Sequence, residues 1–171
     1  MTAPPPRVHI VGRRNCGKTT LVCELITEFT RRGLRVASVK HTHHQHELDT
    51  PGKDSWKHRQ AGAAIVGILS PGMTALFRPC DRIHRDEDRY QSLVSAAADC
   101  HLVIVEGDLH TTAPRIEVWR QSAAEQPWAY EVPGISVVVT DDPMANAPCP
   151  VWARSDVSAI ADKLLNLVST D

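Results

Sequence analysis

Residues 12–20 read GRRNCGKTT and follow directly on the apolar stretch RVHIV at residues 7–11. They satisfy the pattern of a glycine, any four residues, a glycine, a lysine and a hydroxyl residue, which is typical of a phosphate-binding loop. From residue 18 to residue 32, apolar side chains recur at helical spacing, and Gly33 follows as a helix stop. The sequence therefore predicts a strand, a phosphate loop and a helix in direct succession.

Each residue type in this loop has a physical role. Gly12 and Gly17 let the backbone approach a phosphate with no side chain in between, and successive N–H groups at the start of the helix then hold the anion. We expect Lys18 to reach the β- and γ-phosphates and the Thr19 hydroxyl to bind Mg²⁺, with Thr20 as a second hydroxyl nearby. The alternative is a chance glycine-rich turn, and the strand and helix predicted on either side argue against it.

The remaining pattern predicts an α/β fold with a mainly parallel central sheet and an added antiparallel hairpin or edge. RIEVWR at residues 115–120 alternates polar and apolar residues, as a half-exposed or edge strand does. The helix from residue 54 to residue 60 has Asp54 or Ser55 as its expected N-cap. Predicted strands are 7–11, 35–40, 101–107, 115–120 and 134–142, the hairpin pairs 64–69 with 73–77, and predicted helices are 18–32, 54–60, 85–99 and 156–168.

Composition narrows the class of protein. The chain has 171 residues, of which 42% are apolar and 23% charged, and we expect a single nucleotide-binding domain over residues 1–171. A net charge of −1 gives no general support for nucleic-acid binding. Five cysteines without a CxxC pair indicate a reduced, cytoplasmic protein, and no apolar run approaches the roughly 20 residues of a membrane-spanning helix. We expect neither nucleic acid nor membrane as a partner.

A carboxylate ends the most apolar predicted strand, LVIVE at residues 102–106. In open α/β sheets, ligands bind at the carboxyl ends of the strands. We therefore expect Glu106 to hold Mg²⁺ directly or through water, and the alternative is a solvated charge at a strand end. Asp108 and His110 follow closely and are candidates for the same site.

Four of the nine histidines gather in HTHHQH at residues 41–46, within a polar loop that shows no periodicity. Imidazole is a common metal ligand, but no cysteine pair or second histidine cluster lies nearby to complete a zinc site. The alternatives are a solvated loop and a loop that senses nucleotide or contacts a partner. The candidate ligands are His41, His43, His44 and His46.

At this point the chain resembles the molybdopterin-guanine dinucleotide biosynthesis adaptor family, MobB. The resemblance rests on GRRNCGKTT, on VKHTHH (39–44) followed by Asp49, PGKDS and AGA, and on LVIVEG (102–107). It implies a three-layer, P-loop GTPase-like fold, a homodimer and weak Mg²⁺-dependent GTP hydrolysis. It also implies an adaptor role for the guanylyltransferase that attaches GMP to molybdopterin, with molybdopterin itself as a further candidate ligand.

The resemblance also carries roles onto positions of this chain. Glu106 becomes the metal-associated acid, and Asp49 a second Mg²⁺ contact. Asp49 lies in a signature loop, residues 41–55, that is expected near the phosphates or the dimer partner. The residues implied for the nucleotide site are Gly12, Asn15, Cys16, Gly17, Lys18, Thr19 and Thr20.

Selection of guanine needs a separate residue, because the chain lacks the Asn-Lys-X-Asp sequence by which many GTPases read the base. VVVTDDP offers Asp141 or Asp142 at the corresponding place, after a predicted buried strand. A carboxylate can accept hydrogen bonds from the N1–H and the amino group of guanine, which adenine cannot match. We favour Asp141.

Two other functions fit the same scaffold. One is an ATP-dependent small-molecule kinase or ligase whose histidine loop binds the acceptor, and the other is a metallochaperone GTPase that delivers a metal through that loop. No side chain is an obvious general base, which fits slow hydrolysis.

The sequence also gives an argument for a homodimer. Ile116, Val118 and Trp119 would be poorly placed on an exposed edge strand and could pair across a two-fold axis.

Overall fold

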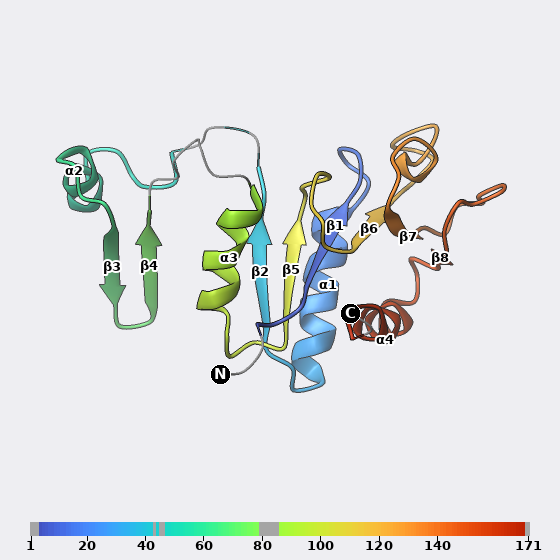
Figure 1. Cartoon of the computed structure of the whole chain (residues 1–171), viewed down its shortest axis with the longest axis horizontal. Coiled ribbons are helices and arrows are strands. Elements are labelled where there is room, and N and C mark those ends of the chain that lie inside the picture. Colours follow the sequence, from blue (N-terminus) through green and yellow to red (C-terminus); the bar gives the residue numbers. More distant parts are fainter. Residues whose placement is uncertain (1–3, 43, 45–46, 79–85, 170–171) are drawn as a thin grey trace. The chain divides into compact units, whose positions relative to one another are not determined.

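The computed structural model of the chain describes residues 4–42, 44, 47–78 and 86–169 (Figure 1). These residues form two compact units, one comprising residues 1–42 and 90–171 and the other residues 43–89. Each unit is described by itself below. The expectation of a single domain over residues 1–171 stays a prediction.

The first unit is built on a six-stranded sheet in the order β2-β5-β1-β6-β7-β8, and every neighbouring pair is parallel. The order reverses at β1, since the chain runs first to one side of that strand and later to the other. Ligands of open α/β sheets bind at such a reversal, beyond the carboxyl ends of the strands. The strands are β1 (Arg7–Val11), β2 (Val36–Lys40), β5 (Leu102–Glu106), β6 (Arg115–Val118), β7 (Ile135–Val139) and β8 (Val151–Trp152).

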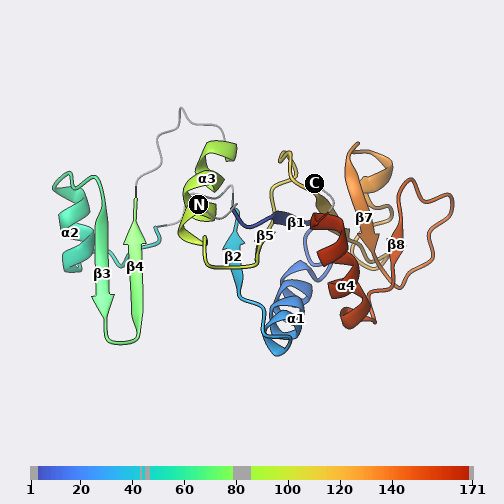
Figure 2. The same cartoon turned by 60° about the horizontal axis from the view of Figure 1, so that its bottom comes forward.

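Helices cover both faces of this sheet and make three layers. Helices α1 (Lys18–Arg31) and α4 (Val157–Val168) lie side by side on one face, and α3 (Asp86–Ala96) contributes to the other (Figure 2). Successive side chains of β5 point to opposite faces of the sheet, so they pack against different helix layers. Leu102 and Ile104 pack with α1 and α4, whereas Val103 and Val105 pack with Tyr90 of α3. The predicted mainly parallel α/β fold is confirmed.

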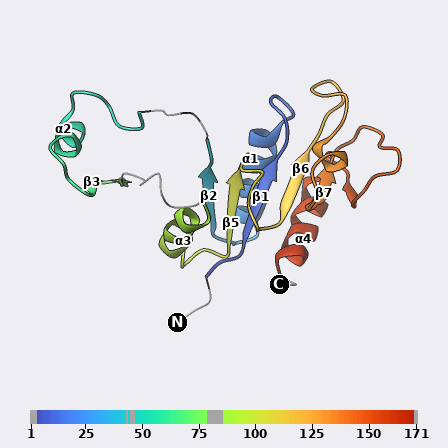
Figure 3. The ribbon, with the colours of Figure 1, turned by 45° about the horizontal axis from the view of Figure 1, so that its top comes forward.

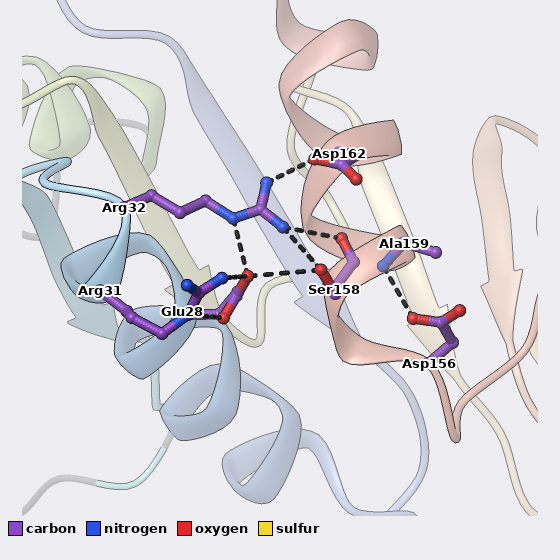
Figure 4. A network of polar contacts seen from close by, with 7 residues as sticks. All are labelled: Glu28, Arg31, Arg32, Asp156, Ser158, Ala159 and Asp162. Atoms are coloured by element: carbon purple, nitrogen blue, oxygen red, sulfur yellow. Dashed lines mark hydrogen bonds and ion pairs between the residues drawn. The ribbon is translucent and has the colours of Figure 1, made fainter.

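A polar network joins α1 to α4 at the surface (Figure 4). Glu28 accepts hydrogen bonds from Arg31 and Arg32, and Arg32 also donates to Ser158 and pairs with Asp162. The bonds from Arg31 and then Arg32 lower the pKa of Glu28 to about 2. The carboxylate is therefore charged at neutral pH and holds both arginines at the seam between the helices.

Strand β6 differs from the sequence prediction. It lies inside the sheet between β1 and β7, not at an edge, and Ile116 and Val118 are buried in the main core. The polar residue that produced the alternation, Glu117, is fully buried as well, because the short 3₁₀ helix η1 (Trp128–Tyr130) begins against its carboxylate. The argument for a dimer from an exposed β6 edge is therefore wrong.

The second unit contains α2 (Asp54–Gln60) and an antiparallel hairpin of β3 (Val66–Ser70) and β4 (Met73–Phe77), as predicted. The N-cap of α2 is Lys53 and makes no side-chain capping bond, so the expectation of a cap at Asp54 or Ser55 is wrong. Among the described residues, no helix is both long and apolar enough to cross a membrane.

Candidate functional site

The phosphate loop, residues 12–20, lies at the carboxyl end of β1 and takes a conformation that requires its glycines. Gly12 has a φ of 140° and Gly17 a φ of 94°, and Asn15 between them is also left-handed at 64°. A Cβ on Gly12 would lie only 2.3 Å from the carbonyl oxygen of Val118. The loop is thus seated against the end of β6, where a side chain at position 12 has no room.

Two side chains of the loop form hydrogen bonds to its own backbone. The buried Cys16 thiol and the Lys18 ammonium both donate to the carbonyl oxygen of Arg13, at 2.7 Å each. Burial raises the pKa of Cys16, so the thiol is neutral at physiological pH and acts as a small packed donor. The structure brings these predicted site residues into one turn, with the first turn of α1 directly behind them.

Glu106 is the acidic group next to this loop. The Thr19 hydroxyl donates to its Oε1 at 2.8 Å, and the Lys40 ammonium pairs with the same oxygen. The Glu106 side chain is only 8% exposed, so the carboxylate is aimed at these two partners and not at bulk solvent. A hydroxyl and a carboxylate that the sequence predicts as Mg²⁺ contacts therefore meet at the carboxyl edge of the sheet.

This pair of oxygen groups fits Mg²⁺. The ion prefers oxygen ligands, keeps several waters and is held in nucleotide sites by one or two protein groups plus phosphate oxygens. Thr19 and Glu106 offer such a pair, and the Lys40 ammonium shows that the Glu106 carboxylate already accommodates positive charge. Asp49 belongs to the second unit, where its Oδ1 accepts from the Ser55 hydroxyl at 2.9 Å. Its role as a Mg²⁺ contact stays a prediction.

Two basic side chains at this edge were missed by the sequence analysis. Lys40 ends β2, and the sheet register places it directly opposite Glu106. Arg120 follows β6, and its guanidinium lies 3.1 Å from where a Cβ on Gly17 would be. Lys40 stands inside the quoted VKHTHH motif, but only the pairing of β2 with β5 shows what it faces.

The two carboxylates after β7 bond to opposite neighbours. Asp141 accepts from the backbone N–H of Ser155 at 3.0 Å and from its hydroxyl at 3.1 Å, on the side of β8. These bonds, the backbone one first, lower the pKa of Asp141, which is therefore a carboxylate at neutral pH. Asp142 accepts from the backbone N–H of Gln121 at 2.8 Å, on the side of β6. Of the two, Asp141 keeps an exposed side chain.

The other candidates have local roles. Asp108 is buried in a left-handed conformation and accepts from the backbone N–H of His110 at 3.0 Å, which makes a tight turn after β5. His41 is half-buried with its ring 6.2 Å from that of Tyr90, and His44 is exposed.

The predicted histidine ligands cannot be judged as a set, because His43 and His46 lie outside the described residues. Within the described ranges, no group of three or more histidine, cysteine, aspartate or glutamate side chains is placed to hold a metal ion. The kinase and metallochaperone alternatives stay predictions.

Comparison with known proteins adds three findings. The family described as Molybdopterin guanine dinucleotide synthesis protein B, MobB, matches residues 7–141. The molybdopterin-guanine dinucleotide biosynthesis adapter protein of Escherichia coli (strain K12) is 33% identical over 159 residues, which cover 92% of this chain and 90% of that protein. A crystal structure of molybdopterin-guanine biosynthesis protein B has a TM-score of 0.70 at 31% identity, covering 95% of this chain and 99% of the other.

A further solved structure, MobB of Bacillus subtilis, has a TM-score of 0.72 at 20% identity and covers 97% of this chain and 99% of the other. At that identity, the likeness concerns the fold alone.

Proposed function

The chain belongs to the MobB family and is an adaptor of molybdopterin guanine dinucleotide biosynthesis, and on that premise we propose that it acts by binding GTP together with Mg²⁺. The observation that supports this most is the hydrogen bond of 2.8 Å between Thr19 and Glu106. It joins the hydroxyl at the end of the phosphate loop to the acid at the end of the neighbouring strand. The two oxygen groups that a Mg²⁺–nucleotide complex needs from the protein are thus side by side.

In this proposal, the residues of the loop divide the work. The backbone N–H groups from Gly12 to Thr19 and the Lys18 ammonium bind the phosphates, and Thr19 and Glu106 hold Mg²⁺, which neutralises phosphate charge when bound. Lys18 must then exchange the Arg13 carbonyl for phosphate oxygens. Glu106 is engaged by Thr19 and Lys40 and is not available as a base toward water, and we therefore propose that hydrolysis is slow.

The phosphate-site assignment is tested by Lys18→Ala. Loss of a hydrogen bond from a charged group costs about 1.5–3 kcal/mol, so GTP binding should weaken about 10- to 100-fold. Lys57→Ala, on the exposed face of α2, is the matched lysine control and should leave the affinity unchanged. Isothermal titration calorimetry with Mg²⁺–GTP measures both. Equal affinities for Lys18→Ala and the unaltered protein would overturn the assignment.

We propose that Asp141 selects guanine. Its bonds from Ser155 keep it ionised and fix one oxygen, while the side chain stays exposed at the carboxyl edge. A carboxylate accepts from two N–H groups of guanine, and an amide presents a donor to one of them. Asp141→Asn should therefore weaken GTP binding about 10-fold and bring it close to ATP binding. A wild-type protein that prefers ATP would contradict this assignment and favour the kinase or ligase alternative.

We further propose a homodimer, with the hairpin of the second unit at the interface. A two-stranded hairpin is marginal on its own, and this one exposes large apolar side chains. Leu69 is 83% exposed, Met73 73% and Leu76 64%. Leu69→Lys together with Leu76→Lys should convert a dimer to a monomer in sedimentation experiments. A chain that is already monomeric at micromolar concentration would refute the proposal.

The partner implied by an adaptor role is the guanylyltransferase that attaches GMP to molybdopterin, acting in the cytoplasm. A pull-down with that enzyme, with and without GTP, tests the association and its dependence on nucleotide. We expect Lys18→Ala to abolish the effect of GTP. If GTP did not change the association with the guanylyltransferase, the adaptor role would be independent of the nucleotide site.

A further inference from the structure

A pocket of about 410 Å³ lies in the first unit, between the loop after β6 and the loop after β7. Figure 3 shows these two loops leaving the same edge of the sheet as the loop after β1. The pocket is lined largely by apolar or aromatic side chains. They include Trp119, Pro127 and Tyr130 from the loop after β6 and Met144 from the loop after β7. The volume lies within the range of small-molecule sites, and Tyr130, 41% exposed, is the aromatic lining residue that is open to solvent.

Hydrogen bonds within and between the two loops stabilise the shape of the pocket. The buried Trp119 donates from its indole nitrogen to the carbonyl of Ala124 at 3.0 Å, and the Tyr130 hydroxyl donates to the carbonyl of Ala145, which ties the two loops together. The buried Glu117 carboxylate fixes the first loop to β6 by accepting from the backbone N–H groups at the start of η1, at 2.7 and 2.8 Å. The aromatic walls are therefore in place before any ligand arrives.

The polar side chains that line the pocket are available for hydrogen bonds to a ligand. Glu125, Gln121, Gln126 and Asn146 line the pocket, and none of their side chains has a hydrogen-bond partner among the described residues. Amides offer donors and acceptors together, and a carboxylate accepts from two adjacent N–H groups. These amide and carboxylate groups, together with an aromatic side chain, suit a flat ring whose edge carries both hydrogen-bond donors and hydrogen-bond acceptors.

The pocket is on the opposite side of the β7 loop from the carboxylate assigned to guanine. Asp141 bonds to Ser155 beyond β8, whereas Asp142 bonds to Gln121, which lines the pocket. A base read by Asp141 therefore leaves the pocket vacant for a second ring.

Two residues that neighbour the pocket lining in the sequence, Trp128 and Glu131, contact the phosphate loop. The Arg13 guanidinium lies 5.5 Å from the ring centre of Trp128 and donates to Glu131 at 3.1 Å. Because Trp128 and Glu131 adjoin the lining residues Pro127 and Tyr130, the same loop carries the pocket lining and the contacts to Arg13.

We propose that this pocket binds a second flat bicyclic ligand with a 2-amino-4-oxopyrimidine edge, as found in a pterin, next to the nucleotide. The Tyr130 ring, which is 41% exposed, stacks on the ligand ring, and the Glu125 carboxylate accepts from the ring N–H and the amino group. This rests on the proposed function, since the family's own description names a molybdopterin product. Guanine shares that edge, so the experiment has to separate the two rings.

The test titrates the full chain with 6-hydroxymethylpterin, followed by pterin fluorescence, and in parallel with Mg²⁺–GTP. The pocket variants are Glu125→Ala and Asn146→Gly, the second of which removes the amide while keeping the left-handed backbone at φ 49°. The control is Asp54→Ala, another exposed carboxylate, on α2. We expect saturable pterin binding that each pocket variant weakens about 10-fold or more, with no change for Asp54→Ala or in GTP affinity.

Lys18→Ala separates this proposal from the proposed function, because it should weaken GTP and leave the pterin unaffected. Unchanged GTP affinity in that variant overturns the phosphate site, whereas absent or variant-insensitive pterin binding overturns the pocket assignment. If guanosine displaces the pterin and Glu125→Ala weakens GTP, the pocket holds the base of the nucleotide and the second-ligand proposal is wrong.

Discussion

The phosphate loop at residues 12–20 and the segment at residues 47–60 both carry polar motifs, yet they are held in different ways. The loop is seated against the core, with Gly12 pressed on Val118 and Thr19 bonded to Glu106 of the central sheet. The segment makes its polar bonds within its own unit, from Arg59 to Glu47 and from Ser55 to Asp49. In the loop, polar groups are fixed by buried neighbours, whereas in the segment they are fixed by one another.

This difference indicates where binding geometry is set before a ligand is present. Strands β1, β5 and β6 define the position of the phosphate loop, so its backbone is fixed by the central sheet. The bonds of the segment order a turn and a short helix, and they do not by themselves orient a site toward the sheet. The same type of substitution should therefore cost more in the loop than in the segment.

A glycine in each region offers the sharpest test. Gly12→Ala places a Cβ 2.3 Å from a backbone carbonyl at a φ of 140°, and strain and overpacking together should cost about 4 kcal/mol. In the segment, Gly52→Ala at a φ of 82° meets nothing within 4 Å, so only backbone strain of about 1 kcal/mol remains. Urea denaturation measures both. Equal costs would show that the loop is not seated against β6 as described.

A pair of lysines extends the comparison to charge. Lys40 and Lys57 are almost equally exposed, at 63% and 62%, but their partners Glu106 and Asp54 are 8% and 89% exposed. Lys40→Met leaves a nearly buried carboxylate without its cation and should lower the free energy of unfolding by about 2 kcal/mol. Lys57→Met should cost less than about 0.5 kcal/mol. A Lys40→Met protein as stable as Lys57→Met would mean that water replaces the lysine at Glu106.

The sequence sufficed wherever a periodic pattern and its neighbours agreed. RVHIV, the phosphate loop and the helix behind it were predictable because strand, turn and helix signals occur in succession and all concern local structure. LVIVE was predictable as a buried strand because four apolar residues follow one another, and all five of its residues are buried in the structure. The pairing of Thr19 with Glu106 followed in outline, since both lie at carboxyl-edge positions of a parallel sheet.

Most of the misses depend on contacts between residues that are distant in the sequence. RIEVWR reads as an edge strand because Glu117 is polar, and only the η1 segment, eleven residues further on, explains how that carboxylate is buried. Lys40 needed the register of β2 on β5, which no local pattern contains. The pocket needed the approach of residues 119–130 to residues 143–146, stretches without regular periodicity. β8, two residues long, is too short for any periodic signal.

Buried and exposed acids should also respond to pH with opposite signs. Burial raises the pKa of Glu117 above its ordinary value of 4.5. The stability contributed by this group is therefore fully present below pH 4.5 and is lost as the pH rises through the folded-state pKa. Relative to Glu117→Gln, the unaltered protein should lose stability as the pH rises from 4.5 to the raised folded-state pKa, by at most about 1.4 kcal/mol per pH unit. Denaturant titrations at several pH values measure this difference, and a rising one would contradict the burial of Glu117.

Glu47, in the second unit, should show the opposite sign and the smallest effect. The hydrogen bond from Arg59, and then that from the backbone of Asp49, lower its pKa below 4.5. Its contribution is present above pH 4.5 and is lost as the pH falls through the lowered folded-state pKa. Hydrogen exchange of α2, compared between the unaltered protein and Glu47→Gln at matched pH, should differ at pH 6, and the difference should shrink as the pH falls from 4.5 toward the lowered folded-state pKa.

Glu28→Gln is the matched control in the first unit, because the pKa of Glu28 is lowered to about 2 by Arg31 and Arg32. It has the same sign as Glu47, but its arginine partner Arg32 also reaches α4 through Ser158 and Asp162. Its effect on exchange should therefore appear in α1 and α4 together, whereas that of Glu47→Gln should stay within residues 47–60. If Glu47→Gln also changed exchange in α1, the bonds of the segment would not be confined to its own unit, and the contrast between the two regions would fail.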